Sequence, residues 1–127
     1  GDYHPRNIMY ASGHITGIID WSFLIGDPAF DVGNTITIIM DIIPNLSNNC
    51  TLETASQYNE QYRDAYQSIR SIDDEAVAAC RASRCTGFLL HCLSGKKDPI
   101  AASPSMIKSL KTTIETITKL EIALPNS

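Results

Sequence analysis

Several features that would indicate common protein classes are scarce in this sequence of 127 residues. The longest apolar run, residues 36–40, is far shorter than the roughly 18 apolar residues of a membrane span. Lys and Arg number 10 against 14 Asp and Glu, and the formal charge of −4 is unlike the basic surface of a nucleic-acid binder. No secretory signal is visible. We therefore expect neither a membrane nor a nucleic acid as a partner.

The four cysteines lack the paired C-x2-C spacing of a zinc knuckle. A zinc site built from Cys80, Cys85, His91 and Cys92 has the right ligand types. In one helix over residues 74–93, however, Cys80 and His91 would share one face, and Cys85 and Cys92 another. The four side chains could not converge on one ion. We expect free, largely buried thiols in a reducing cytoplasm.

The first forty residues predict a hairpin followed by a helix. Residues 8–10 and 15–19 are β-prone and flank a turn-like stretch, which places Asp20 at the exit of the hairpin. Asp27-Pro28 then resembles a helix start, with Asp as the N-cap and Pro in the first turn. We expect this helix to run to about Ile43 and to end before Pro44.

The remainder predicts three more helices. Thr51 can cap the first, and Ser71 to Asp74 have the spacing of a capping box before the second. Ser103-Pro104 opens the last, after a polar break over residues 94–99. One apolar stripe is expected to pack in the core: Ile107, Leu110, Ile114, Ile117 and Leu120.

The residues able to do chemistry gather at the front of the chain. Asp2 is followed five positions later by Asn7, which is the spacing in the catalytic loop of protein kinases. Phosphoryl transfer needs a carboxylate that positions the acceptor hydroxyl and takes its proton, and a neutral oxygen ligand for Mg²⁺ nearby. A second carboxylate should follow on a short hairpin, and Asp20 stands there. The order and spacing of the three are far more specific than any one of them.

Three motifs together resemble the aminoglycoside phosphotransferase and choline kinase superfamily. Residues 1–8, GDYHPRNI, are similar to its H-G-D-x-H-x-x-N loop, and residues 16–21 and 26–31 resemble its next two signatures in the expected order. The fold class implied is mainly α with a small β-hairpin, as in the C-terminal lobe of a protein-kinase-like fold. The implied division is residues 1–43 for the catalytic loop, metal-binding hairpin and following helix, and residues 44–127 for the helical acceptor-binding part.

The resemblance also implies roles for single residues. Asp2 would be the catalytic base, and His4 would support its loop. Asn7 and Asp20 would bind Mg²⁺ and, through it, the phosphates of ATP. Asp27 and Asp31 would be supporting residues, the first as an N-cap and the second as a brace of the catalytic loop. Plainer interpretations exist: Asn7 as a turn former and Asp20 as a strand-end residue.

The function implied is that of an ATP- and Mg²⁺-dependent phosphotransferase acting on a hydroxyl of a small molecule, such as an aminoglycoside, a macrolide, choline or a sugar. No glycine-rich loop and no strand lysine for the phosphates stand in the chain. We therefore expect a fragment that lacks the N-terminal lobe and is inactive when isolated. The alternatives are a non-catalytic relic or pseudo-kinase that keeps the fold for binding, and a small helical interaction protein.

The acceptor is less well defined. Carboxylates of the helical part could attract a cationic acceptor, although such groups on exposed helix faces are usually only solvated. They are Asp41, Glu53, Glu60, Asp64, Asp73, Asp74 and Glu75. Tyr58, Tyr62 and Tyr66 could form an aromatic wall for a sugar or a quaternary ammonium, or the packed face of their helix.

Overall fold

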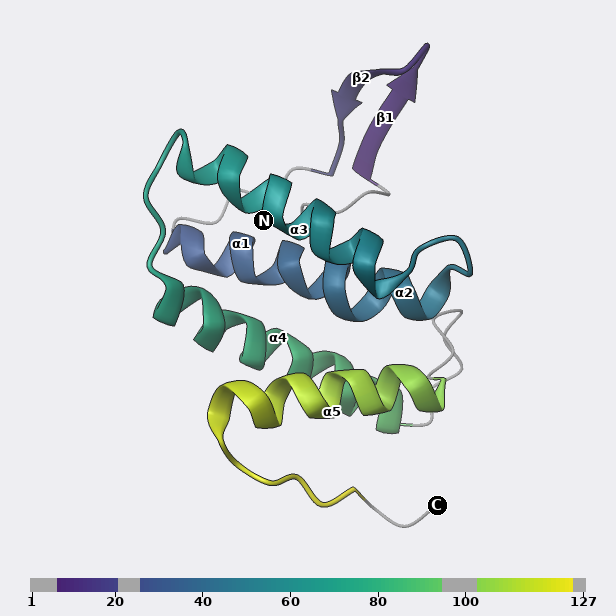
Figure 1. The fold of residues 1–127 in the computed structure, drawn as a ribbon, viewed down its shortest axis with the longest axis vertical. Coiled ribbons are helices and arrows are strands. Elements are labelled where there is room, and N and C mark those ends of the chain that lie inside the picture. The colour runs from purple at the N-terminus through teal and green to yellow at the C-terminus, as the bar shows by residue number, and fades with distance from the viewer. Residues whose placement is uncertain (1–6, 21–25, 95–102, 125–127) are drawn as a thin grey trace.

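A computed structural model describes residues 7–20, 26–94 and 103–124 of the chain. Within these ranges the protein is mainly helical and carries one small sheet of two antiparallel strands. Helix α1 (Pro28–Thr37) lies between α3 (Leu52–Gln67) and α4 (Asp74–Leu93) (Figure 1). Helix α5 (Pro104–Thr118) packs against α4 and against the turn that follows α1. The hairpin projects from this helical stack (Figure 1). No helix in the described part is both long and apolar enough to cross a membrane.

The predicted hairpin is formed by β1 (Ile8–Ala11) and β2 (His14–Ile18). Ser12 and Gly13 connect the strands with φ values of 51° and 79°. Positive φ at both central residues is typical of the turn that matches the twist of antiparallel strands. The pairing register shifts between Met9 and Tyr10, and most of the strand residues are exposed.

The helix after the hairpin extends beyond its predicted end. It begins at Pro28 as α1 (Pro28–Thr37), widens into a π-helical turn η2 (Ile38–Ile42), and continues as α2 (Ile43–Leu46). The prediction that it stops before Pro44 was wrong. A proline ring normally clashes with the carbonyl four residues earlier. The π-helical turn shifts the hydrogen-bonding pattern to five residues, as in the bond from the Ile43 N–H to the Ile38 carbonyl, so Pro44 enters at the start of a new α-helical turn.

The other three helices form as predicted, with one change of cap. They are α3 (Leu52–Gln67), α4 (Asp74–Leu93) and α5 (Pro104–Thr118), and Thr51 and Ser103 cap the first and the last. Helix α4 is capped by Asp73, whose side chain accepts from the backbone N–H groups of Glu75 and Ala76. The expected box that starts at Ser71 is therefore wrong, because Asp73 supplies the capping oxygen itself.

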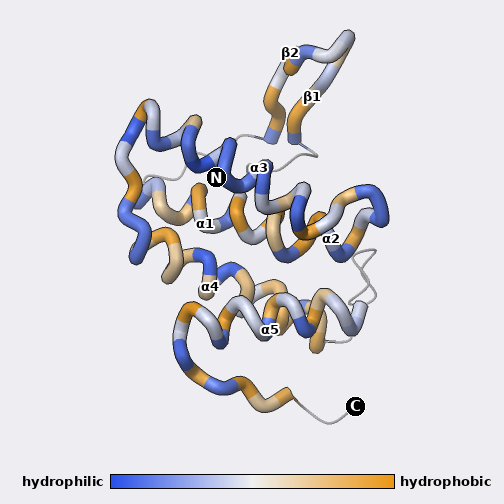
Figure 2. The backbone as a smooth tube through the Cα atoms, viewed as in Figure 1, coloured by the Kyte–Doolittle hydropathy of each residue, from blue (hydrophilic) through white to orange (hydrophobic). Residues whose placement is uncertain are grey.

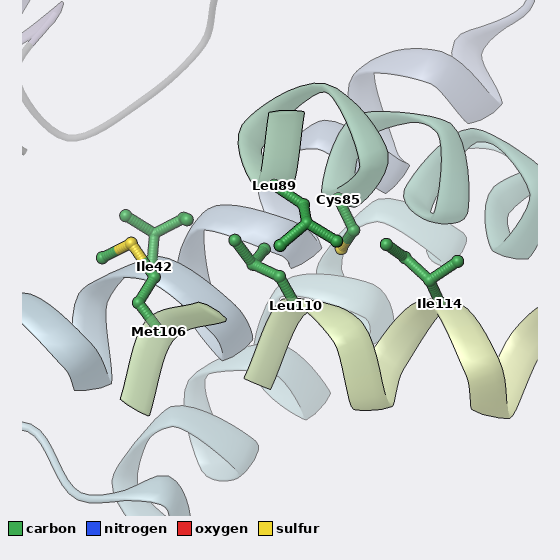
Figure 3. Close-up of a cluster of buried hydrophobic side chains, with 6 residues drawn as sticks. All are labelled: Ile42, Cys85, Leu89, Met106, Leu110 and Ile114. Carbon is green, nitrogen blue, oxygen red and sulfur yellow. The ribbon is translucent and has the colours of Figure 1, made fainter. Parts of the chain in front are cut away.

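The core has two hydrophobic clusters, one that includes η2 and one that includes α1. One joins η2, α4 and α5 and consists of Ile42, Cys85, Leu89, Met106, Leu110 and Ile114 (Figure 3). The other joins α1 to α4 through Ala29, Val32, Ile36 and Val77. Of the predicted stripe on α5, Leu110 and Ile114 are buried, but Leu120 lies beyond the helix end and is 67% exposed. Met106, which the stripe omitted, is fully buried.

Hydrophobic side chains are also exposed on the hairpin. Met9, Tyr10, Ile15 and Ile19 are each at least half exposed. Figure 2 shows hydrophobic positions on both strands as well as on the helices. Because these side chains are exposed, packing adds little to the stability of the hairpin, and an isolated two-stranded hairpin is only marginally stable in water.

Candidate functional site

Backbone pairing brings Asn7 and Asp20 to the same end of the hairpin. The N–H of Ile19 donates to the carbonyl of Asn7 at 2.9 Å, one step beyond the pair of Ile8 with Ile18. Asn7 is 8% exposed, whereas Asp20 is on the surface. Two residues that stand thirteen positions apart in sequence therefore become neighbours across the open end of the sheet.

Asp20 has an unusual backbone conformation. Its φ of 58° lies in the left-handed region, which most residues with a side chain avoid. Asp and Asn tolerate this region better than others because their short polar side chains can bond locally. Asp20 takes this conformation two residues after the end of β2 at Ile18. Such residues are often found at functional sites.

The segment after Asp20 reaches α1 through a capped start. The Oδ1 atom of Asp27 accepts from the N–H of Ala29 at 2.9 Å, and Pro28 occupies the first turn. The N-cap predicted from sequence is thus present. Asp31 is half-buried in the first turn of α1. Its proposed contact with the catalytic loop cannot be placed, because the loop precedes the described residues.

The remaining predicted catalytic residues, Asp2 and His4, lie outside the described residues. Their roles stay predictions. Asn7 and Asp20 offer an amide and a carboxylate, the oxygen donors that Mg²⁺ takes when substrate phosphates complete its coordination. These two residue types therefore fit a magnesium site that a nucleotide would complete. Within residues 7–20, 26–94 and 103–124, no group of three or more His, Cys, Asp or Glu side chains is placed to hold a metal.

The cysteines are free thiols, one buried and three half-buried. Cys85 belongs to the core, and its thiol lies 3.7 Å from Oδ2 of Asp41, to which it donates. Burial, and then the charge of Asp41, raise the pKa of Cys85 from 9.0 to about 12. Burial also raises the pKa of Cys80 and of Cys92. Protonated thiols are poor nucleophiles and poor metal ligands.

Asp41 is the most densely hydrogen-bonded side chain of the described molecule, and sequence reasoning misjudged it. It is 2% exposed and lies in the π-helical turn η2. Oδ2 accepts from Nη2 of Arg81 at 2.8 Å, and Oδ1 accepts from Thr113 at 2.7 Å and Ser109 at 3.3 Å. A buried carboxylate with these partners is not free to attract a cationic acceptor. The available signal was a single acidic residue within an otherwise apolar helix face.

The other carboxylates that were predicted to attract a cationic acceptor are exposed. Glu53, Glu60 and Asp64 are on the surface of α3. Asp73 caps α4, and Asp74 accepts from Nη2 of Arg63 at 2.6 Å. Structural roles thus account for Asp41, Asp73 and Asp74.

The tyrosines of α3 divide between two roles. Tyr62 and Tyr66 lie 6.3 Å apart by ring centroid and pack on the cluster that joins α1 to α4. Tyr58 is 58% exposed. Together with Tyr62 it lines an apolar cavity of about 620 Å³ between β1, η2 and α3. The interpretation as the packed face of the helix thus fits Tyr66, and the interpretation as part of an aromatic wall fits Tyr58.

Comparison with known proteins places the chain in a family. No curated protein and no solved structure matches it. A family model described as "Phosphotransferase enzyme family" matches residues 1–80, which is more than half of the chain. The match includes the hairpin, all of the helical segment from Pro28 to Leu46, and α3. The chain therefore belongs to the phosphotransferase enzyme family.

Proposed function

We propose that this chain is the acceptor-side lobe of a kinase-like phosphotransferase that uses ATP and Mg²⁺ to phosphorylate a hydroxyl of a small molecule. The observation that carries the proposal is the hydrogen bond from Ile19 to Asn7, which holds Asn7 beside Asp20. A neutral oxygen ligand and a carboxylate at one end of a hairpin are residue types that a magnesium–nucleotide complex requires.

In this proposal, each residue has a defined task. Bound Mg²⁺ would neutralise charge on the phosphate oxygens. Asn7 and Asp20 hold the metal, Asp2 orients the acceptor hydroxyl and takes its proton, and His4 supports the loop of Asp2. Asp27 fixes the start of α1 through its bond to the Ala29 N–H, and so fixes the exit of the chain from the site.

The acceptor is proposed to bind against the helices that follow the hairpin. Glu60 and Asp64 stand one helical turn apart on the exposed side of α3 and would attract a cationic acceptor. Asp41 takes no part in this, because its carboxylate is satisfied inside the protein.

A further polypeptide segment is proposed to complete the nucleotide site. The hairpin exposes Met9, Tyr10, Ile15 and Ile19, and side chains of this kind are typical of surfaces that other polypeptide covers. The 127-residue chain has no glycine-rich loop of its own, so by itself it is expected to transfer little or no phosphate.

The test is a titration of a fluorescent ATP analogue with and without Mg²⁺, made on the longest natural polypeptide that contains these residues. The proposal expects Mg²⁺-dependent binding that Asp20→Asn abolishes and that Glu121→Gln, a change of the same kind at an exposed residue after α5, leaves intact. Retained motifs without any nucleotide affinity would instead identify a non-catalytic relic. Phosphate transfer by the isolated 127 residues would contradict the need for a second segment.

A further inference from the structure

A groove that combines apolar and polar side chains lies beside Asp41, and none of residues 7–20 lines it. It has a volume of about 510 Å³ and is bordered by the end of η2, α2, α4 and α5. Its polar lining includes Asp41, Asn45, Arg81, Ser105, Lys108 and Thr112. The volume falls in the range of roughly 300–1,000 Å³ that is usual for small-molecule sites.

The carboxylate in this groove has no capacity left for a cationic ligand. Both oxygens of Asp41 accept from protein donors, Arg81 at 2.8 Å on one side and Thr113 at 2.7 Å on the other. The pair with Arg81 cancels one positive charge against one negative charge. A cation entering the groove would find the only carboxylate among its lining residues already bonded by protein donors.

Positive charge remains after that cancellation. Lys108 is exposed on the α5 wall and forms no ion pair within the described residues. The side chain of Arg81 is still 24% exposed beside it. With Arg81 and Asp41 paired, Lys108 leaves one net positive charge at the groove, in a chain whose overall charge is −4. A local positive excess on an acidic protein favours anions at this place over the rest of the surface.

Helix α5 adds to the same preference. Ser103 caps the helix, and Ser105 and Lys108 come from its first five residues. The N-terminal end of a helix carries partial positive charge, which stabilises a nearby anion. Serine and threonine hydroxyls on this wall can donate to anion oxygens.

We propose that this groove binds a small ligand through a phosphate or carboxylate group placed between Arg81 and Lys108. The site is separate from the proposed magnesium site. Neither Asn7 nor Asp20 lines the groove. The inference does not depend on phosphotransfer, since it rests on the charges and contacts of the groove alone.

The test compares three probes that share one carbon skeleton: glycerol 3-phosphate, glycerol and 3-amino-1,2-propanediol. Each is titrated into the ¹⁵N-labelled 127-residue chain while the backbone amide shifts of α5 are followed by NMR. We expect saturable shifts around Ser105 and Lys108 with glycerol 3-phosphate and none with the neutral or the cationic probe.

Two matched variants locate the contact. Lys108→Ala should weaken binding of glycerol 3-phosphate about threefold to fivefold, the size expected for one exposed charge pair. Lys111→Ala, on the same helix, removes a lysine that lies 3.4 Å from Glu115 and does not line the groove, so binding should not change. Both residues are partly or fully exposed, and circular dichroism should show both variants folded.

Three results would overturn the proposal. The first is an absence of saturable shifts in α5 up to roughly 50 mM glycerol 3-phosphate, which is far above a millimolar Kd. The second is an equal loss of affinity in the two lysine variants, which would show only diffuse charge attraction. The third is stronger binding of the amino probe than of the phosphate probe. None of these outcomes depends on whether the chain takes part in phosphotransfer.

Discussion

At the scale of single residues, Asp20 meets two separate demands. Its carboxylate is the proposed Mg²⁺ ligand, and its backbone adopts a φ of 58° two residues after the end of β2. Only a few residue types satisfy the second demand without strain. The two demands can be separated, because Asn keeps the backbone tolerance and loses the charge.

We predict that Asp20→Asn leaves the free energy of unfolding nearly unchanged, whereas Asp20→Val lowers it by about 1–2 kcal/mol, since a β-branched residue is strained in the left-handed region. Both variants should lose Mg²⁺-dependent nucleotide binding. Urea denaturation measures the first effect and the nucleotide titration the second. Equal stability of the two variants would show that the φ of Asp20 imposes no constraint.

Cys85 provides a pH-dependent prediction. Its pKa is raised to about 12 in the folded chain, above the 9.0 of a free thiol. The folded state therefore holds its proton more tightly than the unfolded state. The contribution to stability is fully present below pH 9 and is lost as the pH rises towards 12, by about 1.4 kcal/mol per pH unit.

The measurement is the free energy of unfolding between pH 8 and pH 11 for the natural chain and for Cys85→Ala, which lacks this thiol and keeps the other three. We expect the natural chain to show the steeper decline. Parallel pH profiles of the two proteins would exclude the buried thiol as the cause.

At the scale of elements, the crossing of α1 over α4 depends on one glycine. A Cβ atom at Gly33 would come within 2.9 Å of the Arg81 backbone nitrogen and 3.0 Å of the Val77 carbonyl oxygen. Such contacts are too short for backbone atoms that belong to a packed helix. The close approach also places Cys80 against α1.

Gly33→Ala should therefore lower the free energy of unfolding by about 1–3 kcal/mol, the usual cost of overpacking. Gly87→Ala on α4 is the control, because nothing lies within 4 Å of its added Cβ. There the higher helix propensity of Ala should stabilise the protein by up to about 1 kcal/mol. Thermal unfolding of both variants tests the pair, and stabilisation by both would contradict the close crossing.

At the scale of the whole molecule, Asp41 connects three segments that are distant in sequence. It lies in η2 and bonds Arg81 of α4 and Ser109 and Thr113 of α5. The hydrophobic cluster of Figure 3 joins the same three elements. A charged contact and an apolar core thus hold α5 in place together.

Removing this carboxylate leaves the Arg81 guanidinium partly buried without its partner. Asp41→Ala should lower the free energy of unfolding by about 3 kcal/mol, at the low end for broken buried ion pairs because Arg81 is 24% exposed. Lys111→Ala, which removes the partly exposed pair with Glu115 and leaves the bond from the Ile122 N–H to Glu115 in place, should change the free energy of unfolding far less. Chemical denaturation of both variants provides the comparison, and a loss under 1 kcal/mol for Asp41→Ala would contradict the proposed role of the network.

Local signals in the sequence were sufficient for most elements. The turn at Ser12-Gly13, the caps Asp27, Thr51 and Ser103, and the period of apolar residues act within a few positions of the chain, so they can be read without tertiary contacts. The hairpin between Asn7 and Asp20 was likewise predicted from sequence, and the backbone bond from Ile19 to Asn7 extends its pairing by one step; the metal-binding role of the two residues stays a prediction.

The tertiary structure decided what depends on distant neighbours. Nothing near Asp41 in the sequence indicated its partners, because Arg81 and Thr113 are forty and seventy-two residues away along the chain. The helix continues through Pro44 because of the π-helical turn before it. The need for a residue without a side chain at Gly33 arises from the close approach of the α4 backbone. Sequence by itself determined the elements and the order of the catalytic motifs, because these follow from short-range backbone preferences. Only packing decided which polar groups are buried and paired, since burial is a property of the whole fold.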